Sequence, residues 1–378
     1  MENLENKKYW IWFSLIKGLG CVRKNKLLKI YGTPEKIYKL SKRELLKVDG
    51  IGEETVTNII EAKNEKILNY HIKYMEENNI DIIHICEKSY PQILKQIYDA
   101  PVSLYIRGNK EILNGKNIGI VGCRECTDYG KKAAKYFAYN LSKEKSVNIV
   151  SGLAKGVDSY AHWGSVGANI EFESKKNCGK EQTGCEKLDI TCEKLKNSCG
   201  KINNDCGEIK ERCGKINNDC GEIKEKCGKL KNDCGKTIAV LGNGLDMIYP
   251  KENIELANEI IRNGGAIISE YPCGTKPDKM NFPARNRIIS GMSQGIIVIE
   301  AKEKSGTLIT VDFALEQGRD VFVVPGNINS INSVGTNDLI KQGAKIVTSY
   351  EDIEQIWKFS IFSLNSTFYH TQKNWNFQ

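Results

Sequence analysis

Long apolar runs are missing from this sequence. None of its 378 residues lies in an uninterrupted apolar stretch of the roughly 18 residues that a membrane-spanning helix requires. The N-terminus, Met1–Lys8, is charged, and the apolar stretch Tyr9–Ile16 is too short for a secretory signal and lacks a small-residue cleavage site. We therefore expect neither a membrane protein nor a secreted one, but a cytoplasmic protein.

Metal-binding and catalytic clusters are also lacking. Histidine is scarce, with four residues, and no grouping of Ser, His and Asp is evident. Of the 14 cysteines, those from Cys178 to Cys234 recur at a strict seven-residue step. Zinc sites usually use pairs such as C-x₂-C whose thiols converge on one point, whereas this step spreads thiols along a line. Disulfide frameworks belong to small secreted proteins, so we expect free thiols and no metal.

The charge balance is basic but not decisive. The formal net charge is +8, from 55 Lys and Arg residues against 47 Asp and Glu residues. A basic balance favours a polyanionic partner, although many proteins of similar charge bind no nucleic acid. The positions of the basic residues therefore carry more information than their sum.

Residues 1–65 have the pattern of a small helical domain. Lys17–Gly20 precedes an amphipathic run from Val22 to Tyr31, and Val48–Gly52 precedes a second run from Glu53 to Ala62. This pattern resembles the SAM-like helix-hairpin-helix, in which a glycine turn brings backbone N–H groups against a phosphate. The alternative is a helical bundle whose glycines only cap helices. The presence of two copies favours contact with DNA.

From about Asn117 onward, short β-rich runs alternate with helical segments. The runs are Ile118–Gly122, Asn148–Ser151, Thr237–Leu241, Ala266–Ser269, Ile296–Glu300, Val321–Val324 and Lys345–Thr348. The helical segments include Lys131–Lys143, Asn253–Asn263 and Ser305–Gln317. Strands that are apolar on both faces and separated by helices indicate a parallel sheet covered on both sides. We predict an α/β fold with an extended Rossmann-like, doubly wound, mostly parallel sheet over residues 66–350, to which Ile82–Ile85 and Ser103–Ile106 add strands or a lead-in.

One insertion, residues 169–235, interrupts this alternation. Its heptads carry Cys at one position and Leu or Ile three residues later, which is the a/d stripe of a coiled coil. Most heptads also contain Gly, Asn or Asp, which oppose helix formation. Because the insertion leaves one element of a compact domain and returns to the next, its ends must lie close together. A helical hairpin and a flexible loop both satisfy this condition, and a tolerated surface repeat is the simplest interpretation.

Glycine-containing turns follow the first two predicted strands. They are Gly122-Cys123-Arg124 and Ser151-Gly152-Leu153-Ala154-Lys155-Gly156. A strand, a glycine turn and a helix expose backbone N–H groups and the positive end of the helix to an anion. The first turn lacks the dinucleotide fingerprint G-x-G-x-x-G, so no nicotinamide or flavin cofactor is expected. We predict an anion site from Gly122, Arg124, Gly152, Lys155 and Gly156, with a structural salt bridge as the alternative role of Arg124.

Two further segments suit an extended anion. One helix start combines an aromatic ring, two guanidinium groups and an amide, from Phe282, Arg285, Asn286 and Arg287. Another is rich in hydroxyl groups and glycine, from Ser305, Gly306 and Thr307. All these turns meet at the carboxyl edge of a parallel sheet and can line one groove. Phe282 could instead pack onto the sheet, but the neighbouring charges argue against burial. His162 is interpreted as a packing residue.

The ordered motifs resemble the successive signatures of the DprA/Smf family of DNA-processing proteins. They are Gly122–Arg124, Ser151–Asp158, Leu241–Asp246 with Tyr249–Pro250, Ser269–Pro272, Phe282–Arg287, Ser305–Thr310 and Val324–Gly326. The resemblance covers roughly residues 66–168 and 236–350. It implies homodimerisation, binding of single-stranded DNA without sequence specificity through the anion-suited residues above, and loading of RecA onto DNA taken up during natural transformation.

Two other functions are compatible with parts of the sequence. A Rossmann-like nucleotide hydrolase resembling phosphoribohydrolases would use Glu270 or Glu300, each at a strand end, as an acid–base group. Neither has a partner carboxylate at a clear spacing, so we do not expect an enzyme. A scaffold assembled through the cysteine heptads is the third interpretation.

The tail, residues 351–378, is too short for the winged-helix domain that some family members carry.

Overall fold

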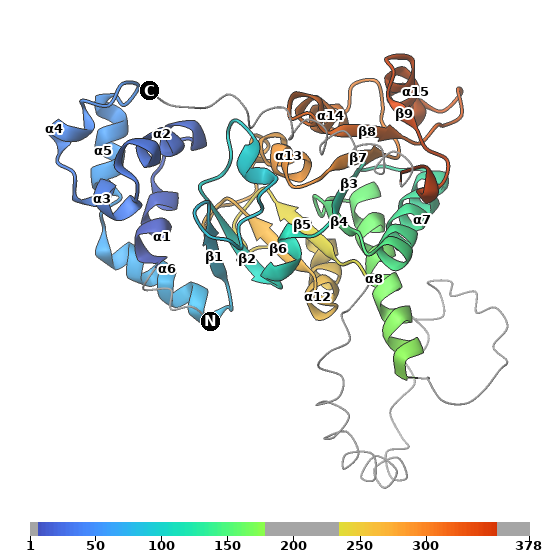
Figure 1. Ribbon diagram of the computed structural model, residues 1–378, viewed down its shortest axis with the longest axis horizontal. Helices are drawn as coiled ribbons and strands as arrows, with labels where there is room; N and C mark the ends of the chain where they lie inside the picture. Colours follow the sequence, from blue (N-terminus) through green and yellow to red (C-terminus); the bar gives the residue numbers. More distant parts are fainter. Residues whose placement is uncertain (1–6, 178–233, 354–378) are drawn as a thin grey trace, which may run out of the picture. The chain divides into compact units, whose positions relative to one another are not determined.

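The computed structural model describes residues 7–177 and 234–353 (Figure 1). Most of the predicted cysteine heptads, and the tail beyond residue 353, lie outside the described residues. The features below belong to the compact unit formed by the residues up to Phe172 and those from Cys234 onward. Nowhere in the described ranges is a helix both long enough and apolar enough to cross a membrane.

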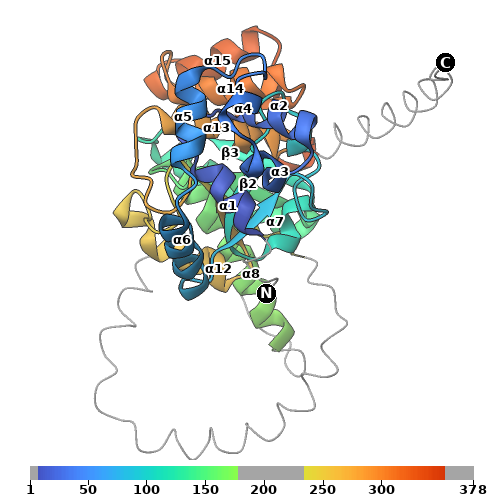
Figure 2. The same ribbon diagram turned by 90° about the vertical axis from the view of Figure 1, so that its left-hand side faces the viewer.

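Helices form the N-terminal part of the chain, drawn in blue in Figure 2. They are α1 (Lys8–Leu15), α2 (Cys21–Tyr31), α3 (Pro34–Lys39), α4 (Lys42–Leu45), α5 (Glu53–Glu61) and α6 (Glu65–Glu77). A capping box between Ser41 and Glu44 starts α4. The two predicted glycine turns precede α2 and α5, with Gly20 and Gly52 at the N-cap positions. The helical domain expected from the sequence is therefore confirmed.

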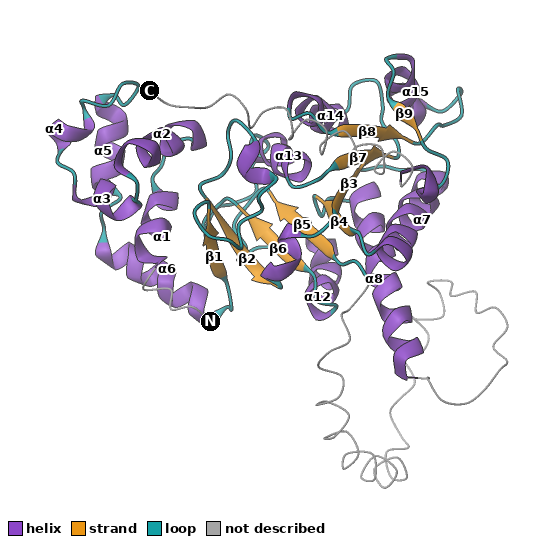
Figure 3. Cartoon of the chain, in the orientation of Figure 1, coloured by secondary structure: helices purple, strands orange, loops and turns teal. Residues whose placement is uncertain are grey.

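A single sheet forms the rest of the core (Figure 3). Its strands are β1 (Asp81–His84), β2 (Ser103–Gly108), β3 (Asn117–Val121), β4 (Asn148–Ser151), β5 (Thr237–Leu241), β6 (Ala266–Ser269), β7 (Gly295–Val298), β8 (Asp320–Val323) and β9 (Lys345–Ile346). Their spatial order is β1-β2-β6-β5-β4-β3-β7-β8-β9. The pairs β1–β2 and β2–β6 are antiparallel, and the other pairs are parallel. The predicted mostly parallel sheet is confirmed.

Helices cover both faces of this sheet. They are α7 (Asp128–Lys145), α8 (Val157–Asn177), α12 (Ile254–Arg262), α13 (Asn281–Gly291), α14 (Gly306–Glu316) and α15 (Val334–Lys341). Short 3₁₀ turns occur at Leu94–Gln96, Lys110–Asn114, Lys251–Asn253 and Ile331–Ser333. On one face, Ile120 of β3 packs with Phe137 of α7. On the other face, Val298 of β7 packs with Ile288 of α13 and Val311 of α14. Burial on both faces explains why the strands read as continuous apolar runs.

The strand order reverses between β3 and β7. The chain runs outward from β3 through β4, β5 and β6 in one direction, and from β7 through β8 and β9 in the other. Ile120 of β3 pairs in register with Ile297 of β7. Ligands of open α/β sheets bind in the crevice outside the carboxyl ends of the strands at such a switch point. The topology therefore predicts a ligand site outside the carboxyl ends of β3 and β7.

The two ends of the predicted insertion meet, as expected. The Asn169 side-chain nitrogen donates a hydrogen bond to the Gly235 carbonyl at 3.0 Å. The Gly235 N–H donates in turn to the Ser142 carbonyl of α7 at 2.8 Å. Asn169 also accepts a hydrogen bond from the Lys236 ammonium. Both ends are buried parts of the core, so the insertion proper begins after Asn169 and ends before Gly235.

Candidate functional site

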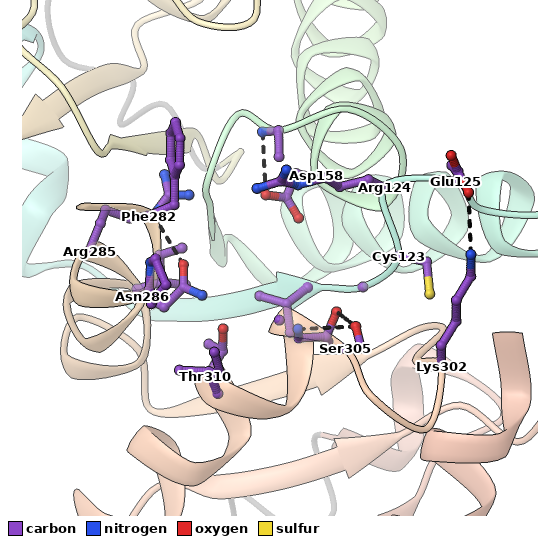
Figure 4. Close-up of a pocket in the computed structure, with 18 of the residues that line it drawn as sticks. Cys123, Arg124, Glu125, Asp158, Phe282, Arg285, Asn286, Lys302, Ser305 and Thr310 are labelled. Carbon is purple, nitrogen blue, oxygen red and sulfur yellow. Dashed lines mark hydrogen bonds and ion pairs between the residues drawn. The ribbon is translucent and has the colours of Figure 1, made fainter. Parts of the chain in front are cut away.

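A cavity of about 660 Å³ opens at the switch point between β3 and β7 (Figure 4). The turn after β3, Gly122–Glu125, lines it, and so do residues of the turn from β7 into α14, Lys302–Gly306. Helix α13 contributes Phe282, Arg285 and Asn286, and Thr307 follows from α14. All four predicted anion-suited segments therefore contribute to one cavity. The turn after β4 contributes only Ala154, and Asp158 follows it on α8.

Two of the predicted glycines act through close packing. A Cβ atom at Gly122 would lie 3.0 Å from the Glu300 carbonyl oxygen and 2.7 Å from the side chain of Val157. Gly156 has a φ of +77°, and a Cβ atom there would collide with the Arg124 carbonyl oxygen. Only glycine tolerates both this φ and this approach. The backbone before α8 therefore supports the turn that carries Arg124.

A buried carboxylate fixes the far end of the same turn. Glu300 is 1 % exposed and accepts hydrogen bonds from the backbone N–H of Thr127 at 2.9 Å and from its hydroxyl at 2.5 Å. Asn332 donates a further hydrogen bond to it at 3.4 Å. A buried carboxylate needs such partners, because an unpaired one is strongly destabilising. Glu300, considered as an acid–base group from the sequence, is thus engaged in holding the start of α7.

An aromatic pair stands at the cavity beside Arg124. The rings of Phe282 and Tyr249 stack with their centroids 5.6 Å apart and their planes 28° apart. The Arg124 guanidinium lies 5.8 Å from the centre of the Phe282 ring. Tyr249 is 46 % exposed, so the pair is open to a ligand. The sequence motif contained Tyr249, but nothing local indicated that it would reach Phe282.

The start of α14 is capped beside the cavity. Ser305 is the N-cap residue, and its hydroxyl oxygen accepts a hydrogen bond from the Thr307 N–H at 3.2 Å. The same hydroxyl donates to the Thr307 side-chain oxygen at 2.9 Å. Gly306 has open space where a Cβ atom would stand. The N-terminus of this helix therefore presents backbone N–H groups and its positive dipole end to the cavity.

Three lysines that sequence reasoning left out of the site also line the cavity: Lys279, Lys302 and Lys304. Lys302 forms an ion pair with Glu125 at 3.2 Å, and both side chains are exposed. The sequence could have indicated two of them, because Lys302 and Lys304 lie beside a predicted turn and Lys304 immediately precedes Ser305. Their ammonium groups add positive charge to the wall of the cavity.

Arg285 lies at the wall of the cavity but is buried, at 4 % exposure. Its guanidinium donates a hydrogen bond to the Gly152 carbonyl at 2.8 Å and another to the Val240 carbonyl. Burial lowers its pKa to about 10, against the opposing effect of the Asp158 charge, so it remains protonated at neutral pH. Burial likewise raises the pKa of Asp158. Arg285 is buried although it neighbours Phe282 in a charged motif, because backbone carbonyls satisfy its guanidinium.

Arg285 also orients its neighbour Asn286. The Nε–H of Arg285 donates a hydrogen bond to the amide oxygen of Asn286 at 3.1 Å. An arginine Nε–H can only donate, so the amide oxygen must face it. The amide nitrogen of Asn286 remains available as a donor in the cavity wall.

Arg287 points away from the cavity. Its guanidinium forms ion pairs with Asp99 at 2.9 Å and with Glu270, and its side chain is 7 % exposed. Residues two apart on a helix do not share a face, which explains why Arg285 and Arg287 separate. Glu270, the second carboxylate considered for catalysis, is held in this ion pair. The structure therefore does not bring Arg287 together with the other predicted site residues.

Lys155 also stands outside the cavity lining. It forms an exposed ion pair with Glu252 at 2.6 Å. Gly152, from the same segment, approaches the core so closely that a Cβ atom would lie 2.6 Å from the Arg285 guanidinium and 2.7 Å from the Asp158 carboxylate. The segment from Gly152 to Asp158 thus supports the cavity more than it lines it.

His162 occupies the packing position inferred from the sequence. It is fully buried on α8, and its Nδ1 shares a hydrogen bond with the Thr237 hydroxyl at 2.6 Å. Burial lowers its pKa to about 3, and the charge of Arg285 acts in the same direction. The imidazole is therefore neutral at physiological pH.

A protein-family model for DNA recombination-mediator protein A matches residues 81–184 and 228–358. The chain belongs to this family. The match covers more than half of the chain and breaks inside the insertion predicted from the sequence. A second model, for the SAM-like helix-hairpin-helix tandem, matches residues 14–64 of the helical domain.

Curated relatives in the recombination-mediator family support the assignment. DNA processing protein DprA of Bacillus subtilis is 35 % identical over 306 residues, which cover 81 % of this chain and 80 % of the relative. DNA processing protein DprA of Streptococcus pneumoniae is 36 % identical over 275 residues, which cover 73 % of each.

Solved structures of family members share the fold. The structure of DNA processing protein A from Streptococcus pneumoniae aligns with a TM-score of 0.65 and 30 % identity, over 92 % of this chain and 97 % of that one. DNA processing protein A from Helicobacter pylori, a structure described for its unique single-stranded DNA binding mode, aligns with a TM-score of 0.50 and 24 % identity. That alignment covers 74 % of this chain and 96 % of the other.

Proposed function

We propose that this chain binds single-stranded DNA, without sequence specificity, in the cavity at the β3–β7 switch point. The observation that carries the proposal is the position of Arg124 over the Phe282 ring in a cavity that also receives the start of α14. Single-strand binding combines a basic groove for the backbone with aromatic rings on which bases stack. The Helicobacter pylori relative is described as binding single-stranded DNA, which supports the same ligand class here.

Different residues of the cavity contact the phosphates and the bases. Arg124, the nearby lysines and the N–H groups of Ser305 and Gly306 take phosphate oxygens. The Phe282–Tyr249 pair takes the face of a base. Stacking tolerates every base, because each has a π-face. Gly122 lets the turn that carries Arg124 pack closely on Val157 and on the Glu300 carbonyl. The Asn286 amide nitrogen donates to an acceptor of the bound strand.

Other predicted site residues support the site from behind. Arg285 ties together the ends of β4 and β5 through the carbonyls of Gly152 and Val240. Gly156 packs on the backbone of the Arg124 turn. We assign these residues to positioning, and we leave Arg287 and Lys155 outside the DNA contact. Glu270 and Glu300 are held by other protein groups, which favours binding over nucleotide hydrolysis.

In the cell, this binding serves recombination. Family membership as a recombination mediator supports a role in loading RecA onto single strands, during uptake and integration of DNA in natural transformation. We further propose that the protein acts in the cytoplasm and as a homodimer. A dimer gives two cavities and therefore longer contact with one strand.

Fluorescence anisotropy with labelled oligonucleotides tests the proposal. The purified protein should bind single strands more tightly than duplex of the same sequence, and affinity should fall as salt rises. Arg124→Ala should weaken binding, whereas Arg262→Ala, a charge-matched change in an exposed ion pair on α12, should not. Equal affinity for duplex, or release of base from a nucleotide, would contradict the proposal. A separate measurement of RecA filament formation on covered single strands tests the mediator step.

A further inference from the structure

A second aromatic and basic cluster lies on α7 and α8, the two helices that start beside the Arg124 turn. The Tyr160 ring of α8 has the Lys135 ammonium 5.3 Å from its centre and the Lys131 ammonium 5.9 Å from its centre. Both lysines belong to α7, and Lys132 between them is exposed. Cation–π contacts of this kind hold long lysine side chains over a ring. None of these residues lines the cavity described above.

The cluster is packed directly against the turn that carries Arg124. The first N–H of α8, from Val157, donates to the Cys123 carbonyl at 3.2 Å. On the other side, Thr127 caps α7 with its hydroxyl oxygen. Both helices therefore start at this turn, and Tyr160 and Lys131 each stand one helical turn beyond their start. Lys135 lies about 10 Å along α7 from that start, at 1.5 Å per residue.

Helix contact fixes the relative positions of the cluster residues. A Cβ atom at Gly164 of α8 would lie 2.7 Å from the Lys135 carbonyl oxygen, so the two backbones touch at this level. Asp128 forms an ion pair with Lys131 at 2.8 Å and offsets one of the three lysine charges. The surface retains a net positive charge beside an aromatic ring. This composition is typical of a surface that follows a single-stranded backbone.

We propose that Lys131, Lys135 and Tyr160 form a second subsite, which binds phosphates of the single strand after it leaves the cavity past Arg124. The proposal rests on single-strand binding in the cavity and extends it. The lysines contact the phosphates, and the Tyr160 ring positions the lysines. Charge complementarity selects the backbone of the same strand as the occupant. Lys132 and Lys135 keep the cluster positive beside the ion pair of Asp128 with Lys131, and α7 and α8 both start beside the Arg124 turn.

Two oligonucleotide lengths isolate the subsite. An oligothymidylate of about five nucleotides fills the cavity, whereas one of about twenty reaches beyond it. The shorter length lies within the usual range of single-strand site sizes, and the longer one exceeds that range. The variant K131A/K135A should bind the short strand like the wild type and the long strand more weakly. The slope of log K against log salt should fall in magnitude by about 0.7 for each lysine, with the long strand only.

The control variant K110A/K116A removes two lysines at the amino edge of the sheet, next to β2 and β3. It should change neither length dependence nor salt slope. Equal loss for both lengths in K131A/K135A would overturn the subsite and indicate a diffuse charge effect. Unchanged affinity for the long strand would overturn it as well. A wild-type protein that fails to bind the short strand contradicts the cavity itself, which distinguishes the two proposals.

Tyr160 gives an independent measurement. Tyr160→Phe keeps the ring and should bind both lengths like the wild type, whereas Tyr160→Leu keeps apolar packing but removes the platform for the lysines. The Leu variant should lose affinity for the long strand alone, with an unchanged melting temperature. If the Phe and Leu variants bind the long strand equally, the ring does not position the lysines and that part of the proposal fails.

Discussion

The guanidinium of Arg124 lies 5.8 Å from the centre of the Phe282 ring. The two residues come from distant motifs, one in the turn after β3 and the other on α13. Their contact places a cation beside a partly exposed aromatic ring. If the proposed function holds, Arg124 binds a phosphate and Phe282 stacks on a base at the same point of the cavity.

Phe282 should matter for binding more than for folding. Its ring is partly exposed and lines the cavity, so Phe282→Ala should cost about 1–3 kcal/mol of binding free energy and little stability. Phe282→Tyr keeps the ring and serves as the control. A core residue would behave differently, with a loss of about 3–5 kcal/mol in the free energy of unfolding. A large fall in melting temperature with unaltered affinity of the folded protein would refute the stacking role.

Substitution of Arg124 and of Lys155 should affect the salt dependence of DNA binding differently. Arg124→Ala should lower the magnitude of the log K versus log salt slope by about 0.7, the value of one phosphate contact on a single strand. Lys155 is engaged with Glu252 outside the cavity, so Lys155→Ala should leave the slope unchanged. Titrations at two or more salt concentrations measure both slopes. A reduced slope for Lys155→Ala alone would place the phosphate path on the other side of the turn.

Arg285 should be a stability residue. It is buried and donates to two strand-end carbonyls, and its charge faces the buried Asp158. Arg285→Met leaves that carboxylate without its cation and should lower the free energy of unfolding by about 3–5 kcal/mol. Arg262→Met on the surface of α12 is the control and should be nearly neutral. Denaturant unfolding measures both. A small change in stability with a reduced salt slope would instead identify Arg285 as a phosphate contact.

His162 should make the fold sensitive to acid. Its pKa is about 3 in the folded protein, against 6.5 for an ordinary histidine. The unfolded chain therefore takes up a proton at this imidazole below about pH 6.5, while the folded chain stays neutral there. The stability that this residue contributes is complete above pH 6.5 and is lost as the pH falls toward 3.

The magnitude can be measured by unfolding in urea at several pH values. In that window His162 should lower the free energy of unfolding by up to about 1.4 kcal/mol for each pH unit of acidification. His162→Gln removes the titrating group, so its free energy of unfolding should depend less steeply on pH than that of the wild type. Identical slopes in the two proteins would show that the imidazole is not held neutral.

The insertion should be dispensable for binding if the cut respects its buried ends. Excision of residues 173–233 with a short glycine linker keeps Asn169 and Gly235, whose hydrogen bond joins α8 to the segment before β5. This variant should retain both melting temperature and DNA affinity. Excision of residues 169–235 also removes that hydrogen bond and the one from Gly235 to Ser142, and it should lower the melting temperature. If the shorter excision fails to fold, the insertion belongs to the core.

Local sequence was sufficient for the elements and their class. Apolar runs such as Ile118–Gly122 predicted strands, since burial on both faces leaves no polar alternation. Glycine turns and helical periods between them predicted a doubly wound sheet, and a parallel sheet brings its strand ends to one edge. For this reason Gly122, Arg124, Phe282 and Ser305 could be assigned to one site before the fold was known.

Only the tertiary structure decided which side chains face the cavity. Arg285 and Arg287 are two residues apart in one motif, yet one joins strand ends at the cavity wall and the other pairs with Glu270 on another face. Tyr249 reaches the cavity because its ring stacks on the ring of Phe282, which α13 carries. Local sequence encodes periodicity and turn chemistry, whereas the direction of a long side chain depends on partners that are distant along the chain. Those partners exist only after the sheet has formed.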